Sequence, residues 1–276
     1  MRGFVLSIVA LLFLVFLFLI ATSLHSHYLA MERVLLLSEP VTYADFSADQ
    51  AVYGLNSILG PRISMDPGNA SFGILISQDT PAKNVSSLLS RYQDLLEQDL
   101  AEASHASISL NLSGVSSSSY QMEIADSYLF SNSQEGKMEF RGISGESGAY
   151  SYSINITVPK ERISLIPFGS GSPSGINTTI RYLDLNGSYS EETILNPSGT
   201  SEFLVQFTDN STLRVFIGRD SGDDGALVIE AMNCSAQISL GAALPPLNES
   251  QRPSYTYEVW INHSSGPYSV ERRIST

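Results

Sequence analysis

The residues best suited to bind a metal ion are three aspartates in a short, glycine-containing loop. The loop reads Asp220-Ser-Gly-Asp-Asp-Gly225, so Asp220, Asp223 and Asp224 supply carboxylate oxygens on a flexible backbone. Oxygen ligands of this kind suit Ca²⁺, but the spacing is not that of an EF-hand loop. A charged turn between two strands accounts for the same residues without a metal. Both interpretations stay open, and Ca²⁺ is the one cofactor that the sequence suggests.

Motifs of the common enzyme classes do not occur in the chain. Nucleophilic catalysis needs a base, usually His, near Ser or Cys, and beyond His27 the chain has only His105 and His263. G-x-S-x-G, H-E-x-x-H, C-x-x-C and P-loop sequences do not occur. Two carboxylates could still meet in space and hydrolyse a glycoside, although no pair is singled out. We predict that the chain is not an enzyme and keep a secreted carboxylate-dependent hydrolase as a distant alternative.

Asparagine placement is the strongest chemical signal in the chain. Of 13 asparagines, ten begin an Asn-x-Ser/Thr triplet without proline in the middle. Ser and Thr make up 57 of 276 residues, so chance placement would give only about three such triplets. The pattern predicts an exported surface that carries N-linked glycans. The predicted acceptors are Asn69, Asn84, Asn111, Asn155, Asn177, Asn186, Asn210, Asn233, Asn248 and Asn262.

Charge and cysteine content restrict the partners and the stabilising forces. Residues 38–276 hold 13 Lys and Arg against 27 Asp and Glu, which gives a net charge of 13 − 27 = −14. Such a domain repels phosphate backbones, so nucleic acid is not expected as a partner. Cys234 is the only cysteine, so an internal disulfide cannot form, and its apolar surroundings predict a small buried residue.

An uncharged stretch from Phe4 to Leu24 contains 16 Phe, Leu, Ile or Val residues among 21. As a helix it would be about 32 Å long, close to the thickness of the bilayer core. Its insertion would gain on the order of 6 kcal/mol. We predict a single-pass helix with a cytoplasmic N-terminus and an extracellular bulk. A cleaved signal peptide ending at Ala21-Thr22-Ser23 is the alternative.

The residues before this stretch resemble the start of type IV pilin-like proteins. Met1-Arg2-Gly3 is a short basic leader that ends in Gly, and Phe4 begins the apolar helix. The resemblance covers residues 1–37 and implies a cut between Gly3 and Phe4 and packing against other filament subunits. Bacterial members usually carry Glu at the fifth residue after the cut, where Ile8 stands here, so the resemblance is to an archaeal-type surface protein.

Helical periodicity predicts three further helical segments. Residues 25–37 extend the apolar helix until Pro40, residues 45–59 form a short helix that Gly60-Pro61 ends, and residues 82–103 form the longest soluble helix. Thr80 and Pro81 are suited to begin that last helix. Between the second and third segments, Phe72–Ser77 is expected to be a strand.

From Ser107 onwards, the period of the apolar residues becomes two, which predicts β-hairpins. The expected pairs are 137–143 with 149–158, 176–185 with 188–195 around a type I′ Asn186-Gly187 turn, 202–207 with 212–217, and 254–262 with 267–274. Residues 226–240 form one long apolar run. The fold class expected is α+β, mainly β, with the transmembrane helix followed by helices and an antiparallel β-sandwich-like ectodomain.

The loop 168–175 allows two domain organisations. It either separates a proximal α+β unit, 38–167, from a distal β unit, 176–276, or is a long loop within one domain.

Together these features predict a membrane-anchored, N-glycosylated cell-surface protein with a structural or adhesive role, and a pilin-like subunit is one form that this role could take. Its partners would be the lipid bilayer, through Phe4–Leu24, and other surface or filament subunits. The alternative is a ligand- or carbohydrate-binding ectodomain in which Tyr255, Tyr257 or Trp260 contacts a sugar.

Overall fold

The computed structural model describes residues 53–276 apart from 69, 81–84, 101–106, 113–114, 116–118, 144–147, 170, 221–222, 248–253, 266–267 and 276. The predicted membrane helix, its extension to Leu37 and the Gly3–Phe4 cut lie outside these residues. Among the residues described, no helix is both long and apolar enough to cross a bilayer.

The described chain is mainly β, and its strands form two stacked sheets. Sheet A has six strands in the order β1 (Arg62–Pro67), β2 (Phe72–Thr80), β14 (Ala236–Leu244), β7 (Ser151–Thr157), β9 (Ile176–Asp184) and β10 (Gly187–Leu195). Every pair in it is antiparallel except β7 with β9, which is parallel. The parallel pair arises because β8, between them in sequence, belongs to the other sheet.

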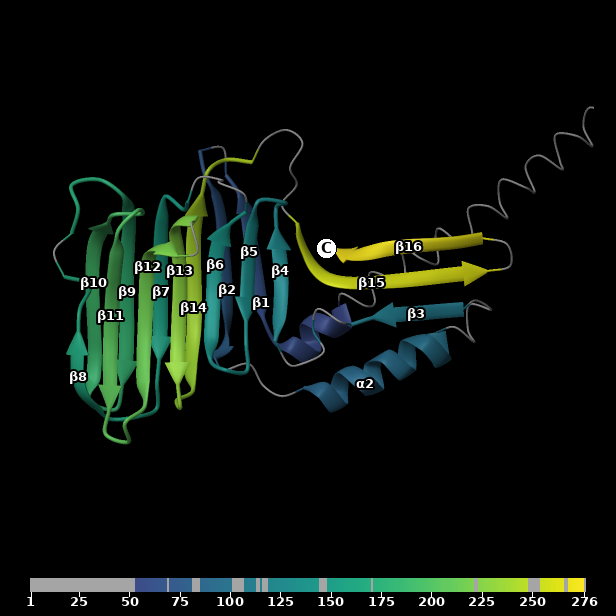
Figure 1. Cartoon of the computed structure of the whole chain (residues 1–276), viewed down its shortest axis with the longest axis horizontal. Coiled ribbons are helices and arrows are strands. Elements are labelled where there is room, and N and C mark those ends of the chain that lie inside the picture. The colour runs from purple at the N-terminus through teal and green to yellow at the C-terminus, as the bar shows by residue number, and fades with distance from the viewer. Residues whose placement is uncertain are drawn as a thin grey trace, which may run out of the picture.

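Sheet B is larger. Its order is β16 (Tyr268–Ser275), β15 (Tyr255–Ser265), β4 (Tyr120–Ile124), β5 (Tyr128–Asn132), β6 (Lys137–Gly142), β13 (Asp223–Met232), β12 (Thr212–Asp220), β11 (Thr200–Phe207) and β8 (Arg162–Ile166), and β3 (Ser107–Asn111) pairs with β15. Its pairs are antiparallel. Figure 1 shows the strands of both sheets running in nearly the same direction, which is the aligned packing of a β-sandwich.

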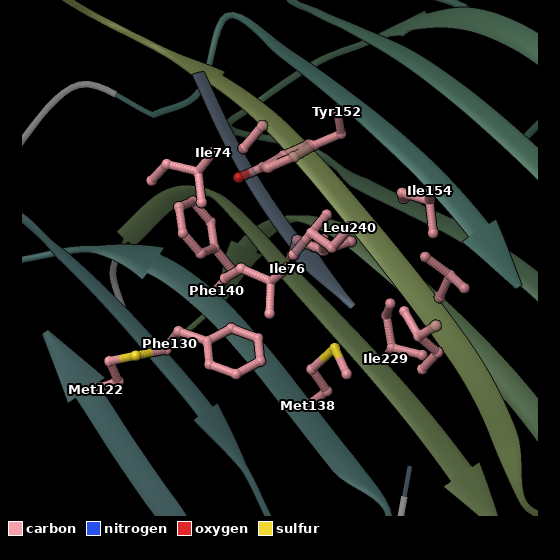
Figure 2. Close-up of a cluster of buried hydrophobic side chains, with 14 of the residues drawn as sticks. Ile74, Ile76, Met122, Phe130, Met138, Phe140, Tyr152, Ile154, Ile229 and Leu240 are labelled. Carbon is pink, nitrogen blue, oxygen red and sulfur yellow. The ribbon is translucent and has the colours of Figure 1, made fainter. Parts of the chain in front are cut away.

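The core lies between the sheets because successive side chains of a strand point to opposite faces. Burial alternates residue by residue along β2, β7, β9 and β14. In Figure 2, Ile74, Ile76, Tyr152, Ile154 and Leu240 of sheet A face Met122, Phe130, Met138, Phe140 and Ile229 of sheet B. Each such side chain contributes roughly 1.5–3 kcal/mol on full burial, so this layer is the main stabilising element of a chain without disulfides.

A smaller layer extends from one side of the sandwich (Figure 1). On one side, the start of β15 pairs with β4 and its later residues pair with β3. Strand β16 pairs with β15 from Thr256 to Ser265. Helix α2 (Ser86–Asp94) continues into the π-helical turn η1 (Leu95–Leu100), which packs beside β3. The Glu97 Oε1 atom accepts a hydrogen bond from the backbone N–H of Leu110 at 2.8 Å and so fixes η1 to β3.

Several predicted elements are confirmed. The strand expected at Phe72–Ser77 is β2, and the hairpins β9–β10, β11–β12 and β15–β16 pair as predicted. The helix at 82–103 is present over 86–100 as α2 and η1, and residues 53–59 form the described part of the helix expected at 45–59. Both sheets combine strands from before and after the loop 168–175, and Phe168 in that loop is buried.

Three local predictions are wrong. Residues 137–143 and 149–158 do not form a hairpin, because β6 pairs in sheet B and β7 in sheet A. The β9–β10 turn is not type I′, because Asn186 does not have the positive φ that this type needs; its N–H instead binds the Asp184 carboxylate at 2.9 Å. Thr80 does not begin a helix, because it is the buried last residue of β2, paired with Ala236.

The apolar run 226–240 is two strands rather than one element. Asn233 adopts a φ of 57° and turns the chain from β13 in sheet B to β14 in sheet A. Asparagine tolerates this left-handed conformation better than most residues, so one strand ends and the next begins in the other layer.

Phe203 occupies the centre of an aromatic cluster, with its ring centroid 5.8 Å from Phe168, 5.9 Å from Tyr182 and 5.9 Å from Tyr189. Phe203→Ala should lower the free energy of unfolding by about 3–5 kcal/mol, because it removes a fully buried ring from a packed core. The measurement is urea denaturation. Phe216→Ala on the neighbouring strand is the control, since Phe216 is only half-buried. Equal losses in both variants would contradict this account of the core.

Candidate functional site

Most of the predicted glycan acceptors that the structure describes lie on the surface of the sandwich. Seven of the ten are among the described residues, and six of these are exposed: Asn111, Asn177, Asn186, Asn210, Asn233 and Asn262. Asn155 is the exception and is half-buried. Asn69, Asn84 and Asn248 lie outside the described residues.

The three asparagines outside Asn-x-Ser/Thr triplets make hydrogen bonds that serve the fold. Asn132 is buried, and its Nδ2 donates to the backbone oxygen of Asp79 at 3.2 Å. Asn56 is half-buried; its Nδ2 donates to the Tyr255 hydroxyl, and its Oδ1 accepts from the Tyr257 hydroxyl. Asn196 is exposed and accepts a hydrogen bond from the N–H of Ser198 within its own turn. Among the described asparagines, only Asn132 is fully buried, and it begins no triplet.

Strand geometry places two of the acceptors, Asn155 and Asn177, on the same face as their hydroxyl residues. Residues i and i+2 of a strand share a face, so Asn155 lies with Thr157 on β7, and Asn177 lies with Thr179 on β9. Both pairs are on the outer face of sheet A, because the residues between them, Ile156 and Thr178, are buried. A modifying enzyme needs both groups of a triplet at the surface, and the strand period supplies this.

Three of the acceptors gather at one end of the sandwich, in the turns after β9, β11 and β13. These are Asn186, Asn210 with a φ of 62°, and Asn233. We call this region the acceptor end. Strands β7, β9, β11 and β13 all finish at this end, at the bottom of Figure 1.

Lys160, in the turn after β7, connects the turns of the acceptor end. Its Nζ donates to Asp209 Oδ2 at 2.5 Å, to Ser211 Oγ at 2.9 Å and to the backbone oxygen of Asn233 at 2.9 Å. The Asp209 carboxylate also accepts from the N–H and the hydroxyl of Ser211. Hydrogen bonds from Lys160 and then from Ser211 hold the pKa of Asp209 well below its usual range. One ammonium group thus fixes two acceptor turns in place.

A hollow of about 550 Å³ lies beside Lys160 and is lined in part by Asn233 and Cys234. The Cys234 thiol is buried, as predicted, and lies 3.3 Å from the backbone oxygen of Thr212. Burial raises the pKa of this thiol, so the reactive thiolate is disfavoured. Cys234 is therefore a packing residue in this end of the core.

The acidic loop is only partly described. Asp220 and Asp223 pair across the β12–β13 turn, but nothing is described of their side chains. The Asp224 carboxylate accepts a hydrogen bond from the Ser198 hydroxyl at 2.7 Å and lies 3.7 Å from Arg219. Among the described residues, no group of three or more His, Cys, Asp and Glu could hold a metal. Ca²⁺ binding at Asp220, Asp223 and Asp224 stays a prediction.

Two carboxylates on sheet B share one arginine. Glu202 and Glu230 both bind Arg214, at 2.7 and 3.5 Å, from the strands on either side of it. Their shared arginine makes them an ion-pair network on an outer face.

The aromatic residues expected to contact sugars differ in exposure. Tyr257 is fully buried, so that expectation is wrong for it. Tyr255 is half-buried against Tyr257, with the two rings 5.9 Å apart. The Trp260 side chain is outside the described set.

A polar groove of about 560 Å³ lies on the outer face of sheet A. Residues 57–60 and Arg62 line its rim, and strands β2, β14 and β7 form its floor. The floor residues come from three strands far apart in the sequence, so no local pattern predicts it. The floor carries two rows of side chains in register, Ser77, Ser239 and Asn155 in one row and Asp79, Gln237 and Thr157 in the next.

Comparison with protein-family models, with curated proteins and with solved structures finds no match to this chain.

Replacing Lys160 by Met should destabilise the acceptor end in a pH-dependent way. A carboxylate whose pKa is lowered by folding stabilises the fold fully above the unfolded value, about 3.9, and this contribution is lost as the pH falls towards the folded value. The urea midpoint of Lys160→Met should be below that of the wild type near pH 6. The difference between the two urea midpoints should shrink as the pH falls from about 5 to about 2.

The matched control for this prediction is Lys137→Met. Lys137 pairs with the nearby Glu139 of its own strand, at 3.4 Å, and such surface pairs contribute little. Two results would count against the role assigned to Lys160. The lowering of the urea midpoint by Lys160→Met could be independent of pH, or it could be no larger than the lowering by Lys137→Met.

Proposed function

We propose that this chain is a membrane-anchored, N-glycosylated cell-surface protein with a structural or adhesive role. The β-sandwich is the extracellular part, and the apolar segment Phe4–Leu24 is the anchor. The N-terminus lies in the cytoplasm, and the bulk of the chain lies outside the cell. We assign it no enzymatic activity.

The observation that supports this proposal most directly is the exposure of the triplet asparagines. They are exposed or half-buried wherever they are described, whereas Asn132, outside any triplet, is buried. Exposed acceptors are what N-glycosylation requires. Chance placement would give only about three triplets where the chain has ten, and six of the ten asparagines are exposed on its described surface.

The charge and the core of the sandwich agree with an exposed location. An excess of 14 acidic over basic residues in 38–276 favours solubility of the sandwich. The core needs no disulfide, so the fold does not depend on the redox state of its compartment.

A finer form of the proposal is a pilin-like subunit. A cut after Gly3 would leave Phe4 as the first residue, and the apolar helix would then be able to pack with those of other subunits. This form rests on the resemblance of residues 1–37 and on the position of the apolar segment before a folded head.

The second candidate is a carbohydrate-binding ectodomain, and the groove on sheet A favours it. Its volume lies within the range of small-ligand sites. Its floor offers hydroxyl, amide and carboxylate groups, which suit the hydroxyls of a sugar.

Peptide mass spectrometry of the natural chain tests the glycoprotein. We expect glycans on the exposed acceptors Asn111, Asn177, Asn186, Asn210, Asn233 and Asn262. Asn56, Asn132 and Asn196 are the internal controls and should be bare, since none of them begins a triplet. Finding every triplet asparagine unmodified would overturn the proposal.

N-terminal sequencing of the mature chain tests the pilin-like form. The expected first residue is Phe4, and Gly3→Leu should block the cut so that the leader stays attached. The substitution leaves the apolar segment Phe4–Leu24 unchanged, so the variant should still fractionate with the membrane. A natural start at Leu24 would remove the anchor and contradict both the pilin-like form and membrane anchoring.

A further inference from the structure

The groove on sheet A contains one acceptor asparagine as part of its own floor. Asn155 lies on β7 between Ser239 of β14 and Arg181 of β9, and its triplet hydroxyl, Thr157, stands in the neighbouring row. Both Asn155 and Thr157 line the groove. Asn155 is also the one described acceptor that is half-buried rather than exposed. A glycan attached there would therefore begin inside the groove.

We propose that the groove is a binding site for the proximal sugars of the N-glycan on Asn155. This inference rests on the proposed N-glycosylation and adds to it a defined position for one glycan. The sugars lie across β14 and β2 towards the helical residues 57–60.

The chemistry of the groove fits this occupant. Gln237 and Asp79 lie in register with Thr157 across β14 and β2 and line the groove, so the row beside that of Asn155 offers amide and carboxylate groups. Arg62 adds a cationic donor at the rim. Such groups donate to and accept from sugar hydroxyls. The small side chains Ser77 and Ser239, whose hydroxyls are 2.9 Å apart, leave the floor low enough for a sugar ring.

Attachment makes even weak contacts effective. The glycan is covalently bound to the floor of its own site, so its effective concentration there is in the millimolar range or above. A free oligosaccharide would need a much larger contact energy to fill the same groove, because it also loses translational and rotational freedom. For equal contacts, covalent attachment therefore favours the chain's own glycan over a free oligosaccharide.

The bound glycan would connect two elements that contribute to the groove. Residues 57–60 precede β1 and form one rim, while the floor belongs to the centre of sheet A. Sugars that contact both would hold the helical segment 53–59 against the sandwich. Asn56, in the same segment, already binds Tyr255 and Tyr257 of β15, and Leu55 is buried in the core, so the glycan would add a further attachment.

The test compares two acceptors on the same face of the same sheet. Thr157→Val prevents glycosylation of Asn155, and Thr179→Val prevents that of Asn177, while both asparagines stay in place. Asn177 is exposed and does not line the groove. In the full natural chain, Thr157→Val should lower the Tm by about 2–4 °C and speed amide exchange over residues 53–60. Thr179→Val should change neither quantity.

Asn155→Gln and Asn177→Gln provide an independent pair that removes the acceptor rather than the hydroxyl, and the same contrast is expected. Site occupancy by mass spectrometry distinguishes failure of this inference from failure of the proposed function. Asn155 bare while other acceptors carry glycans would overturn this inference and leave the proposed function intact. The inference would also be overturned if Asn155 carries a glycan but the two variants of each pair have equal Tm and equal amide exchange over residues 53–60. All acceptors bare would overturn the proposed function itself.

Discussion

The two-residue period of the β-strand is the constraint on which the rest of this structure depends. Because alternate side chains point to opposite faces, each strand can give one face to the core and the other to the surface. Without disulfides, the core has to supply the stability, and it does so with continuous layers of Ile, Leu, Phe and Tyr between the sheets. The same period sets where Asn155 and Thr157 stand. Burial of Ile156 therefore places the acceptor Asn155 and its hydroxyl residue Thr157 on the outer face.

The strands were largely predictable, but their assignment to sheets was not. Alternation in 176–195 and 202–217 predicts β9 to β12, and short turns pair them locally. Strand β6 pairs with β5 before it and with the distant β13, whereas β7 pairs with β14 and β9 in the other sheet. The loop between β6 and β7 therefore looks like a hairpin turn in sequence and is in fact a crossing between layers. Asn233 is similar: its triplet was visible, whereas the left-handed turn that divides an apolar run was not.

The surface asparagines were predictable because a triplet is a local pattern, while the residues that organise them were not. Lys160 is one of a few lysines with nothing distinctive around it in sequence. Its importance arises because the turns after β11 and β13 bring Asp209 and the Asn233 carbonyl to its ammonium group. The groove has the same origin, since Ser77, Ser239 and Asn155 become neighbours only through strand pairing. The local sequence determines the individual side chains of a site, whereas strand pairing in the sheets brings them together.

The pairing of β2 with β14 has a consequence for how the chain reaches its folded state. Strand β2 lies near the start of the sandwich and β14 near its end, yet they are central neighbours along their full length. While the chain is being made from its N-terminus, β2 has only β1 beside it, and its other edge keeps unpaired N–H and C=O groups. Loop-closure entropy makes such non-local pairing slow, and open edges invite association between chains. Sheet A can therefore close only when β14 has been made, so loss of the last strands of the sandwich would be more damaging than the small size of the missing part would suggest.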